Sequence, residues 1–160
     1  MPKVLELGHV GLFIKDPEVM TDFYCRFLGM TITDRDGDRR IFLSARPESE
    51  HHELLLAKDP SRHSDLQQLS FRVASLSDLK EFYAQIVQVG YTIDHVSNHG
   101  NAIGCYFRDP ENNRVEVYWQ TGRDWPQPCS ERIDLGLSEA EILSELDSMS
   151  LPEAENADVR

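Results

Sequence analysis

The sequence predicts an α+β protein built from two copies of one βαβββ unit. Stretches with an apolar residue at every second position alternate with two segments in which apolar residues recur at helical spacing. The order of one strand, one helix and three strands occurs twice along the chain. Apolar positions of the first half also recur in the second half at a constant shift of 59 residues, which indicates an internal duplication.

The first unit is expected over about residues 4–60. Its helix has a capping residue at Asp16, a proline suited to the first helical position at Pro17, and a terminating glycine at Gly29. The apolar stripe of this helix is predicted to consist of Val19, Met20, Phe23 and Phe27. The strands of the unit are predicted at residues 5–14, 30–34, 40–45 and 52–57.

The second unit is expected over about residues 64–120, with a helix that Ser75 or Ser77 caps and Gly90 ends. Its strands are predicted around Leu69, Phe71 and Val73 and at residues 91–96, 104–108 and 114–120. The positions matched at the shift of 59 include Val10 with Leu69, Leu12 with Phe71, Met20 with Leu79 and Phe27 with Ile86. We expect one domain over residues 4–120, with a concave sheet whose trough faces away from the helices.

Composition limits the function further. The formal net charge of −12 argues against a nucleic-acid partner or an anionic membrane, because phosphate groups are bound by clustered Lys and Arg. No apolar run reaches the length of a membrane span, and the first residues lack the hydrophobic region of a signal peptide, so a cytoplasmic location is expected. The three cysteines are odd in number and widely spaced, which favours a reducing compartment.

The last predicted strand, residues 114–120, carries one carboxylate among apolar and aromatic neighbours. Alternation places Val115 and Val117 on one face and Glu116 on the other. At the shift of 59, His9 corresponds to Gln68, and both are expected on the trough side of the first strands, across from Glu116. An exposed glutamate and a hydrogen-bonded histidine are the simpler alternatives for these positions.

Three segments together resemble the vicinal oxygen chelate superfamily. They are Gly8-His9-Val10-Gly11-Leu12, Asp22-Phe23-Tyr24, and the run from Asp109 to Tyr118 with the sequence DPENNRVEVY. This superfamily includes glyoxalase I, extradiol dioxygenases, methylmalonyl-CoA epimerase, and the fosfomycin and bleomycin resistance proteins. The resemblance covers residues 5 to about 120 and implies the duplicated fold, whereas the reaction needs a separate argument from the site.

Within the superfamily the sequence is most similar to extradiol ring-cleaving dioxygenases. The segment 51–56, HHELLL, is similar to the paired-histidine strand that carries their acid/base histidine, which implies this role for His52. Tyr106 lies ten residues before Glu116, as the active-site tyrosine of these enzymes does, and His99 corresponds loosely to a further pocket histidine. Strand alternation is expected to place His52 and Leu54 on the same face.

The resemblance also implies a metal site. In these dioxygenases two histidines and one carboxylate hold Fe(II), with Mn(II) as an alternative, and leave positions open for a catechol and for dioxygen. His9 and Glu116 match two of the ligands, but the third position holds Gln68 in place of histidine. An amide oxygen is a neutral, harder and weaker donor for iron than imidazole. The resemblance implies a catechol-like aromatic diol as substrate, with His52 moving a proton and Tyr106 or His99 bonding the developing charge.

Two other readings of the site stay open. A glyoxalase-like lyase or an epimerase would need a fourth ligand on the last strand of the first unit. Aligning residues 52–55 with 114–117 places Leu54 opposite Glu116, which disfavours that chemistry. A binding module that holds a small aromatic compound or an antibiotic without a metal is the third class, and Gln68 is the feature that favours it.

Residues 121–160 form an acidic extension with nine acidic residues against two arginines after residue 129. Ser138 and Glu141 form a capping box that predicts a helix over about residues 138–147. Its apolar stripe of Ile142, Leu143 and Leu146 is expected to dock on the body or on a second subunit, and we expect a homodimer. Residues 151–160 have the composition of a frayed end.

Overall fold

A computed structural model describes residues 7–63 and 66–149 of the 160-residue chain. The chain divides into two compact units. Unit 1 comprises the residues up to 67 together with 109–113, and unit 2 comprises 68–108 together with the residues from 114 onwards. The predicted start of the first strand at residue 5 and the predicted frayed end at 151–160 lie outside the described residues.

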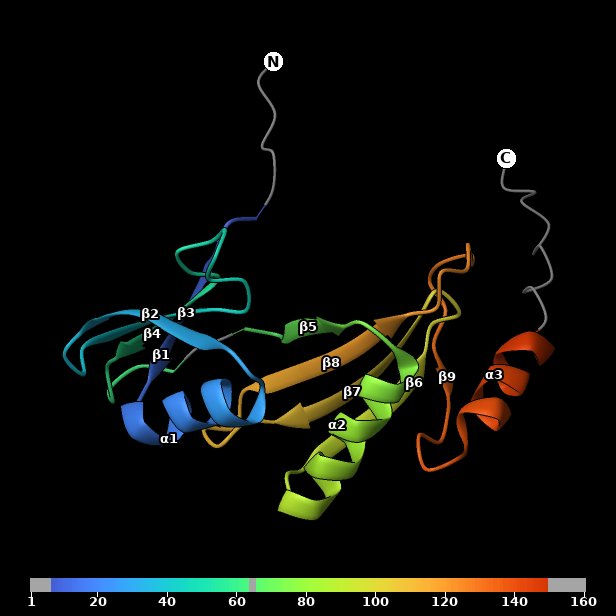
Figure 1. The fold of residues 1–160 in the computed structure, drawn as a ribbon. Coiled ribbons are helices and arrows are strands. Elements are labelled where there is room, and N and C mark those ends of the chain that lie inside the picture. The colour runs from blue at the N-terminus through green and yellow to red at the C-terminus, as the bar shows by residue number, and fades with distance from the viewer. Residues whose placement is uncertain (1–6, 64–65, 150–160) are drawn as a thin grey trace, which may run out of the picture. The chain divides into compact units, whose positions relative to one another are not determined.

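Unit 1 contains a four-stranded mixed sheet in the order β1-β4-β3-β2 (Figure 1). The first and last strands of the unit, β1 and β4, pair in parallel, and the other neighbours are antiparallel. The elements are β1 (Val10–Ile14), α1 (Pro17–Asp22), the π-helical turn η1 (Phe23–Phe27), β2 (Thr31–Asp36), β3 (Arg40–Ser44) and β4 (Leu54–Lys58). One strand, one helical segment and three strands therefore follow each other as predicted.

The helix of unit 1 starts as the sequence predicts but changes its winding halfway. The Asp16 carboxylate accepts hydrogen bonds from the backbone N–H groups of Glu18 and Val19, at 3.0 and 3.1 Å. The predicted stripe is wrong at Val19, which is 45% exposed, whereas Tyr24 is fully buried. The π-helical turn that begins at Phe23 accounts for the burial of Tyr24, because its wider winding shifts the side chains that follow relative to an α-helix. Val19 lies in the α-helical turn before it.

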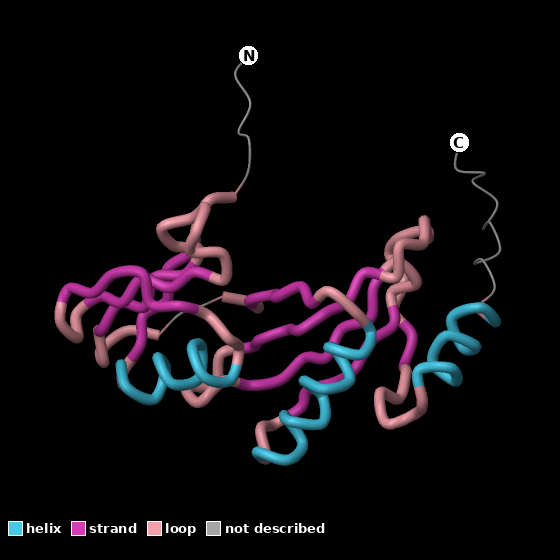
Figure 2. Tube along the Cα trace, in the orientation of Figure 1, coloured by secondary structure: helices cyan, strands magenta, loops and turns pink. Residues whose placement is uncertain are grey.

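Unit 2 repeats the plan with a five-stranded sheet in the order β5-β8-β7-β6-β9 (Figure 2). The first four strands have the same order and directions as those of unit 1, which confirms the predicted duplication. The elements are β5 (Leu69–Val73), α2 (Leu76–Val89), β6 (Ile93–Asn98), β7 (Ala102–Arg108), β8 (Arg114–Gln120), β9 (Glu131–Arg132) and α3 (Glu139–Ser148). Strand β9 was not predicted.

The parallel strand pairs fix the correspondence between the two units. Val10 pairs with Leu54 in unit 1, and Leu69 pairs with Val115 in unit 2. The shift of 59 residues at the first strands therefore becomes 61 at the last strands. The sequence alignment that placed Leu54 opposite Glu116 is wrong by one residue, because it implied a shift of 62 where the strand register gives 61. Leu55 is the counterpart of Glu116.

The hydrophobic core of unit 2 lies between its sheet and α2. Helix α2 packs against β5, β7 and β8, and its residues Leu79 and Ile86 are fully buried. Val115 and Val117 of β8 are also buried, as the alternating pattern predicts. Glu116 lies between them in the strand and therefore points to the sheet face opposite α2.

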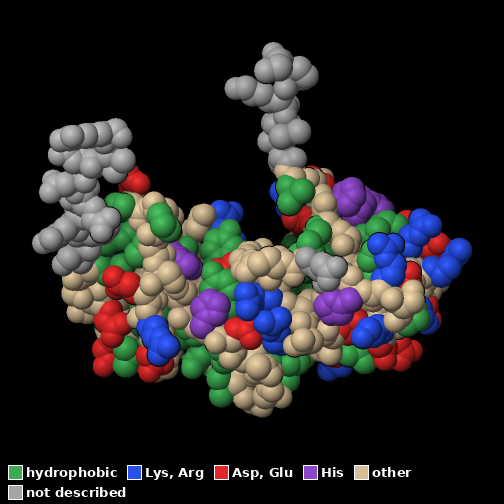
Figure 3. Space-filling view, turned by 180° about the vertical axis from the view of Figure 1, so that it is seen from behind, with side chains coloured by type: hydrophobic (Ala, Val, Ile, Leu, Met, Phe, Trp, Pro, Cys, Tyr) green, Lys and Arg blue, Asp and Glu red, His purple; other side chains and the backbone are tan. Residues whose placement is uncertain are grey.

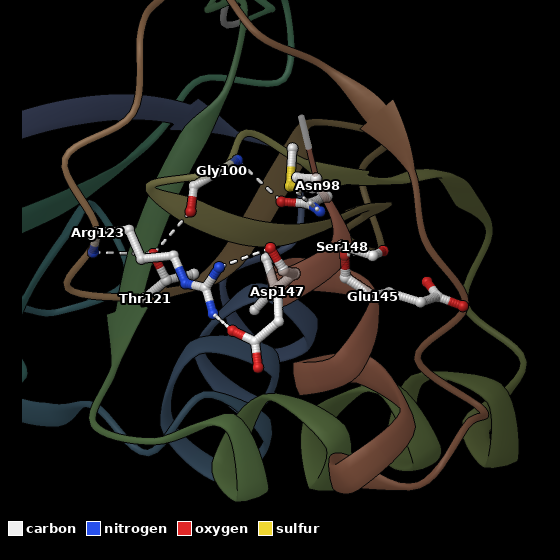
Figure 4. A network of polar contacts seen from close by, with 9 residues as sticks. Asn98, Gly100, Thr121, Arg123, Glu145, Asp147 and Ser148 are labelled. Carbon is white, nitrogen blue, oxygen red and sulfur yellow. Dashed lines mark hydrogen bonds and ion pairs between the residues drawn. The ribbon is translucent and has the colours of Figure 1, made fainter. Parts of the chain in front are cut away.

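The C-terminal extension docks on unit 2 of the same chain. The predicted capping box is present, with Ser138 and Glu141 bonded to each other's backbone N–H groups, and Ile142 and Leu146 of α3 are fully buried. Arg123 donates to the Leu146 carbonyl at 2.6 Å and pairs with Asp147 (Figure 4). Ile142 and Leu146 are thus covered within one chain, whereas the predicted stripe is wrong at Leu143, which is 40% exposed. None of the helices in the described ranges combines the length and hydrophobicity that crossing a bilayer requires.

In unit 2, the Asp94 carboxylate forms ion pairs with both Arg108 and Arg114, with nitrogen–oxygen distances of 2.7 and 2.8 Å. Burial acts to raise the pKa of Asp94, but the two guanidinium groups outweigh it and hold the pKa below its usual value. We predict that Asp94→Asn lowers the free energy of unfolding by about 1–2 kcal/mol at neutral pH, measured by urea unfolding.

The loss should depend on pH. Since the folded-state pKa of Asp94 lies below the unfolded value of about 4, its stabilisation is complete above that pH and disappears as the pH falls through the folded-state pKa. The difference between the wild type and Asp94→Asn should therefore shrink in acid. Asp38→Asn, in an exposed turn, is the control. An equal loss for both variants, or a loss at pH 7 that persists unchanged in acid, would contradict this role.

Candidate functional site

The open sheet face of unit 2 carries a polar cluster centred on Glu116. Parallel pairing of β5 with β8 places Ser70 beside Glu116, and antiparallel pairing of β7 with β8 places Tyr106 on its other side. Gln68 stands immediately before β5, two residues from Ser70, and so reaches the same face. Three neighbouring strands therefore bring residues that are far apart in the sequence to one point.

The Glu116 carboxylate is bonded by neutral donors. Gln68 Nε2 donates to Glu116 Oε2 at 3.0 Å, and the Ser70 hydroxyl donates to the same oxygen. The Gln68 amide also donates to Ser70 Oγ at 2.9 Å. Glu116 is only 7% exposed, and within the described ranges no Lys or Arg forms an ion pair with it. A buried carboxylate without a cationic partner costs free energy, so a purely structural role explains it poorly.

Tyr106 and His99 extend this cluster. The Tyr106 hydroxyl lies 3.1 Å from His99 Nε2, and the His95 ring stacks on the Tyr106 ring with centroids 4.2 Å apart. Burial comes first and the nearby, negatively charged Glu116 carboxylate second as the causes that raise the pKa of Tyr106 far above its usual value. The phenol therefore stays protonated at neutral pH and has a proton to donate.

Gly104 makes room for the carboxylate. It lies on β7, two residues before Tyr106 and on the same face. A Cβ at this position would lie 2.4 Å from Glu116 Oε1, well inside van der Waals contact. Sequence reasoning missed Ser70, His95 and Gly104 as parts of the cluster. The parity of Ser70 along β5 was the one available signal, since it places the hydroxyl on the same face as Gln68.

In unit 1, the two predicted histidines lie next to each other. His9 directly precedes β1, His52 precedes β4, and their ring centroids are 4.3 Å apart. His51 Nδ1 and His52 Nδ1 are 2.9 Å apart, so one of these nitrogens donates and the other accepts. Burial, then the neighbouring His9 and His51, lower the pKa of His52. A neutral imidazole of this kind can accept a proton near neutral pH.

The structure corrects one prediction for His52 and clarifies the role of its neighbour Glu53. The strand begins at Leu54, which is buried, so the alternation argument that put His52 and Leu54 on one face does not apply. Glu53 accepts hydrogen bonds from the Ala45 backbone N–H at 2.9 Å and from Arg46 Nε at 3.0 Å. The Glu53 carboxylate therefore bonds to residues that follow β3 and has a structural role in the loop before β4.

The predicted site residues thus fall into two groups. Gln68, Glu116, Tyr106 and His99 come together in unit 2, and His9 and His52 come together in unit 1. In the parts of the chain that the structure describes, no three or more His, Cys, Asp or Glu residues form a group that could hold a metal ion. The predicted ligand set contains only His9 and Glu116 of these types.

The Gln68 and Glu116 pair nevertheless suits a divalent cation. Rotation of the Gln68 amide about its last bond exchanges Nε2 for Oε1 and directs a second oxygen to the point beside the carboxylate. A cation there would also compensate the buried charge of Glu116. Oxygen donors favour harder ions, so this pair fits Mn(II) or Fe(II) better than a soft metal.

The sequence from residue 6 to residue 117 matches the family model described as Glyoxalase/Bleomycin resistance protein/Dioxygenase superfamily. The chain belongs to this superfamily. The predicted family and the predicted α+β fold are therefore confirmed.

Among curated relatives, a 1,2-dihydroxynaphthalene dioxygenase from Pseudomonas putida is 28% identical over 130 residues, which cover 78% of this chain and 42% of that enzyme. Metapyrocatechase 2 from Cupriavidus necator is 29% identical over 128 residues, with coverages of 75% and 39%. The chain thus spans about two fifths of the length of these curated relatives.

Solved structures support the fold alone. A fosfomycin resistance protein from Listeria monocytogenes superposes with a TM-score of 0.60 at 17% identity and covers 74% of this chain and 96% of its own. A lactoylglutathione lyase from Agrobacterium tumefaciens gives a TM-score of 0.58 at 16% identity, with coverages of 74% and 96%.

We predict that Gly104→Ala lowers the free energy of unfolding by about 1–3 kcal/mol, because the new methyl group displaces the Glu116 carboxylate from its donors. Gly11→Ala is the matched control, since it is also a strand glycine and the nearest atom to its Cβ would be 3.9 Å away. Chemical denaturation followed by circular dichroism measures both. Similar losses for the two variants would show that Gly104 has no particular role in making room for Glu116.

Proposed function

We propose that the chain acts on a catechol-like aromatic diol as an extradiol-type, ring-cleaving dioxygenase that depends on a divalent metal, Fe(II) or Mn(II). The observation that carries the proposal is the buried Glu116 carboxylate, which has Gln68, Ser70 and Tyr106 around it and no cationic partner in the described residues. Relatives named as dioxygenases for dihydroxynaphthalene and biphenyl-2,3-diol support the substrate class.

In this proposal Gln68 and Glu116 supply two metal ligands, and His9 is the third ligand that the family resemblance implies. The bound metal would bring the diol and dioxygen together. Ser70 keeps the carboxylate oriented through its hydroxyl, and Tyr106 presents a hydroxyl group to the bound oxygens. His52 is the proposed acid/base, for which its lowered pKa suits it, and His99 supports Tyr106.

A metal-free binding protein for a small aromatic compound is the second candidate. One observation favours it specifically. Gln68 and Ser70 already provide the Glu116 carboxylate with hydrogen bonds, so the site is polar and satisfied without an ion. In that case a phenol or diol would bind through hydrogen bonds to the same groups, and no oxygen would be consumed.

Turnover distinguishes the two candidates. The purified chain is loaded with Fe(II) or Mn(II) without oxygen, mixed with a panel of catechols and exposed to air. We expect a yellow ring-opened product and matching oxygen uptake. Glu116→Gln should abolish both, whereas Glu131→Gln, an exposed carboxylate on β9, should leave them unchanged. Gln68→His supplies an imidazole ligand and should raise metal affinity by about tenfold.

Two outcomes decide the matter. If the wild type opens no catechol while Gln68→His does, the dioxygenase reading fails for this chain, and metal-free binding is the better account. If Glu116→Gln retains full turnover, the proposed ligand is wrong.

We also propose a cytoplasmic location and a homodimer. The three cysteines, Cys25, Cys105 and Cys129, are all free thiols, which suits a reducing compartment. Lys and Arg side chains are interspersed with acidic ones on the face in Figure 3, in keeping with the expectation of no nucleic-acid partner. Ile142 and Leu146 of α3 are buried within the chain, so these two side chains are not available to a second subunit. Sedimentation velocity of the intact chain should give the mass of two chains, and a single-chain mass would exclude the dimer.

A further inference from the structure

The segment between β8 and β9 lies outside the repeated units, yet it packs on the turn that carries His99. Trp125 covers Gly100, where a Cβ would lie 2.2 Å from the indole and where φ is +75°. Only glycine allows this approach at low cost. The hydroxyls of Ser97 and Ser130 are 2.7 Å apart, and β9 pairs with β6 next to them. The segment thus contacts residues on either side of His99 in the sequence, Ser97 before it and Gly100 after it.

Gln127 links the His99 turn to the segment 125–130 of the same chain. Its Nε2 donates to the His99 backbone carbonyl at 2.7 Å, and its Oε1 accepts from the Cys129 backbone N–H at 3.2 Å. The carbonyl oxygen of Cys129 lies 2.6 Å from His99 Nδ1. The Gln127 side-chain amide therefore fixes the distance between the His99 turn and the Cys129 carbonyl group that the His99 ring contacts.

The carbonyl determines which nitrogen of the neutral ring carries the proton. A carbonyl oxygen can only accept, so His99 Nδ1 must donate, and His99 Nε2 is left with its lone pair. That lone pair lies 3.1 Å from the Tyr106 hydroxyl, which must then be the donor. The Tyr106 hydroxyl has one proton and two acceptors in reach, His99 Nε2 and the Glu116 carboxylate.

We propose that the segment 125–130 is a positioning element for the site, with Gln127 as its positioning residue: it holds His99 in the Nδ1–H form and directs the Tyr106 proton to His99. Without it, His99 can adopt the Nε2–H form and donate to Tyr106, and the Tyr106 proton then turns to Glu116. The extension thereby keeps Glu116 free of one donor and leaves the Tyr106 oxygen able to accept a hydrogen bond from a diol. This last consequence rests on the proposed function.

The tautomer can be measured on the chain without metal or substrate, so its outcome is independent of whether the chain is a dioxygenase. Histidine labelled with nitrogen-15 is incorporated, and long-range proton–nitrogen correlation spectra are recorded at a pH where the ring is neutral. A His99→Asn variant assigns the signal. We expect a single Nδ1–H pattern for His99 in the wild type and its replacement by a mixture or by the Nε2–H pattern in Gln127→Ala.

Gln88→Ala, on the exposed side of α2, should leave the His99 pattern unchanged. If Gln127→Ala does not fold, Gln127→Glu replaces it, because this variant keeps the acceptor for Cys129 and removes the donor to His99; the same loss of the single pattern is expected. An Nε2–H pattern in the wild type would overturn the proposal. So would an unchanged Nδ1–H pattern in a folded Gln127 variant.

Discussion

The hydrogen bonds that join Gln68 and Ser70 to the Glu116 carboxylate are the interaction on which the site depends. They cross the parallel pair of β5 and β8, which are the first and fourth strands of unit 2. They also place a charge where the sheet and its neighbours exclude most water. Desolvation of a carboxylate is unfavourable, and these two hydrogen bonds offset part of that cost.

The duplication makes the specialisation of unit 2 visible. The register of the two parallel pairs equates Ser70 and Glu116 with Gly11 and Leu55 of unit 1. The same backbone position is thus apolar in one copy and carries the polar cluster in the other. The fold provides an open sheet face twice, and only the residues at a few face positions decide which chemistry that face can support.

Much of the fold follows from local patterns, whereas the details of the site do not. The alternation in residues 114–120 and the caps at Asp16, Ser75 and Ser138 are short-range signals, and the structure confirms them. The π-helical turn and the register of β4 depend on packing between elements, which no short pattern encodes. The burial of Tyr24 and the correspondence of Leu55 with Glu116 were therefore not predictable. The proximity of Gln68 and Glu116 was predictable through the repeat and the family motif, and the structure brings the two side chains within hydrogen-bonding distance. His95 and Gly104 escaped prediction because their roles arise only from contacts across neighbouring strands.

The metal content of the purified chain tests the central claim most directly. The chain would be expressed in medium supplied with iron and manganese, purified without chelators and analysed by mass spectrometry of the elements, alongside Glu116→Gln. The account predicts about one bound iron or manganese ion per wild-type chain and its loss in the variant, because the buried carboxylate is the strongest ligand of the set. Equal and negligible metal in both proteins would contradict it and leave Glu116 as a hydrogen-bonding group of a metal-free site.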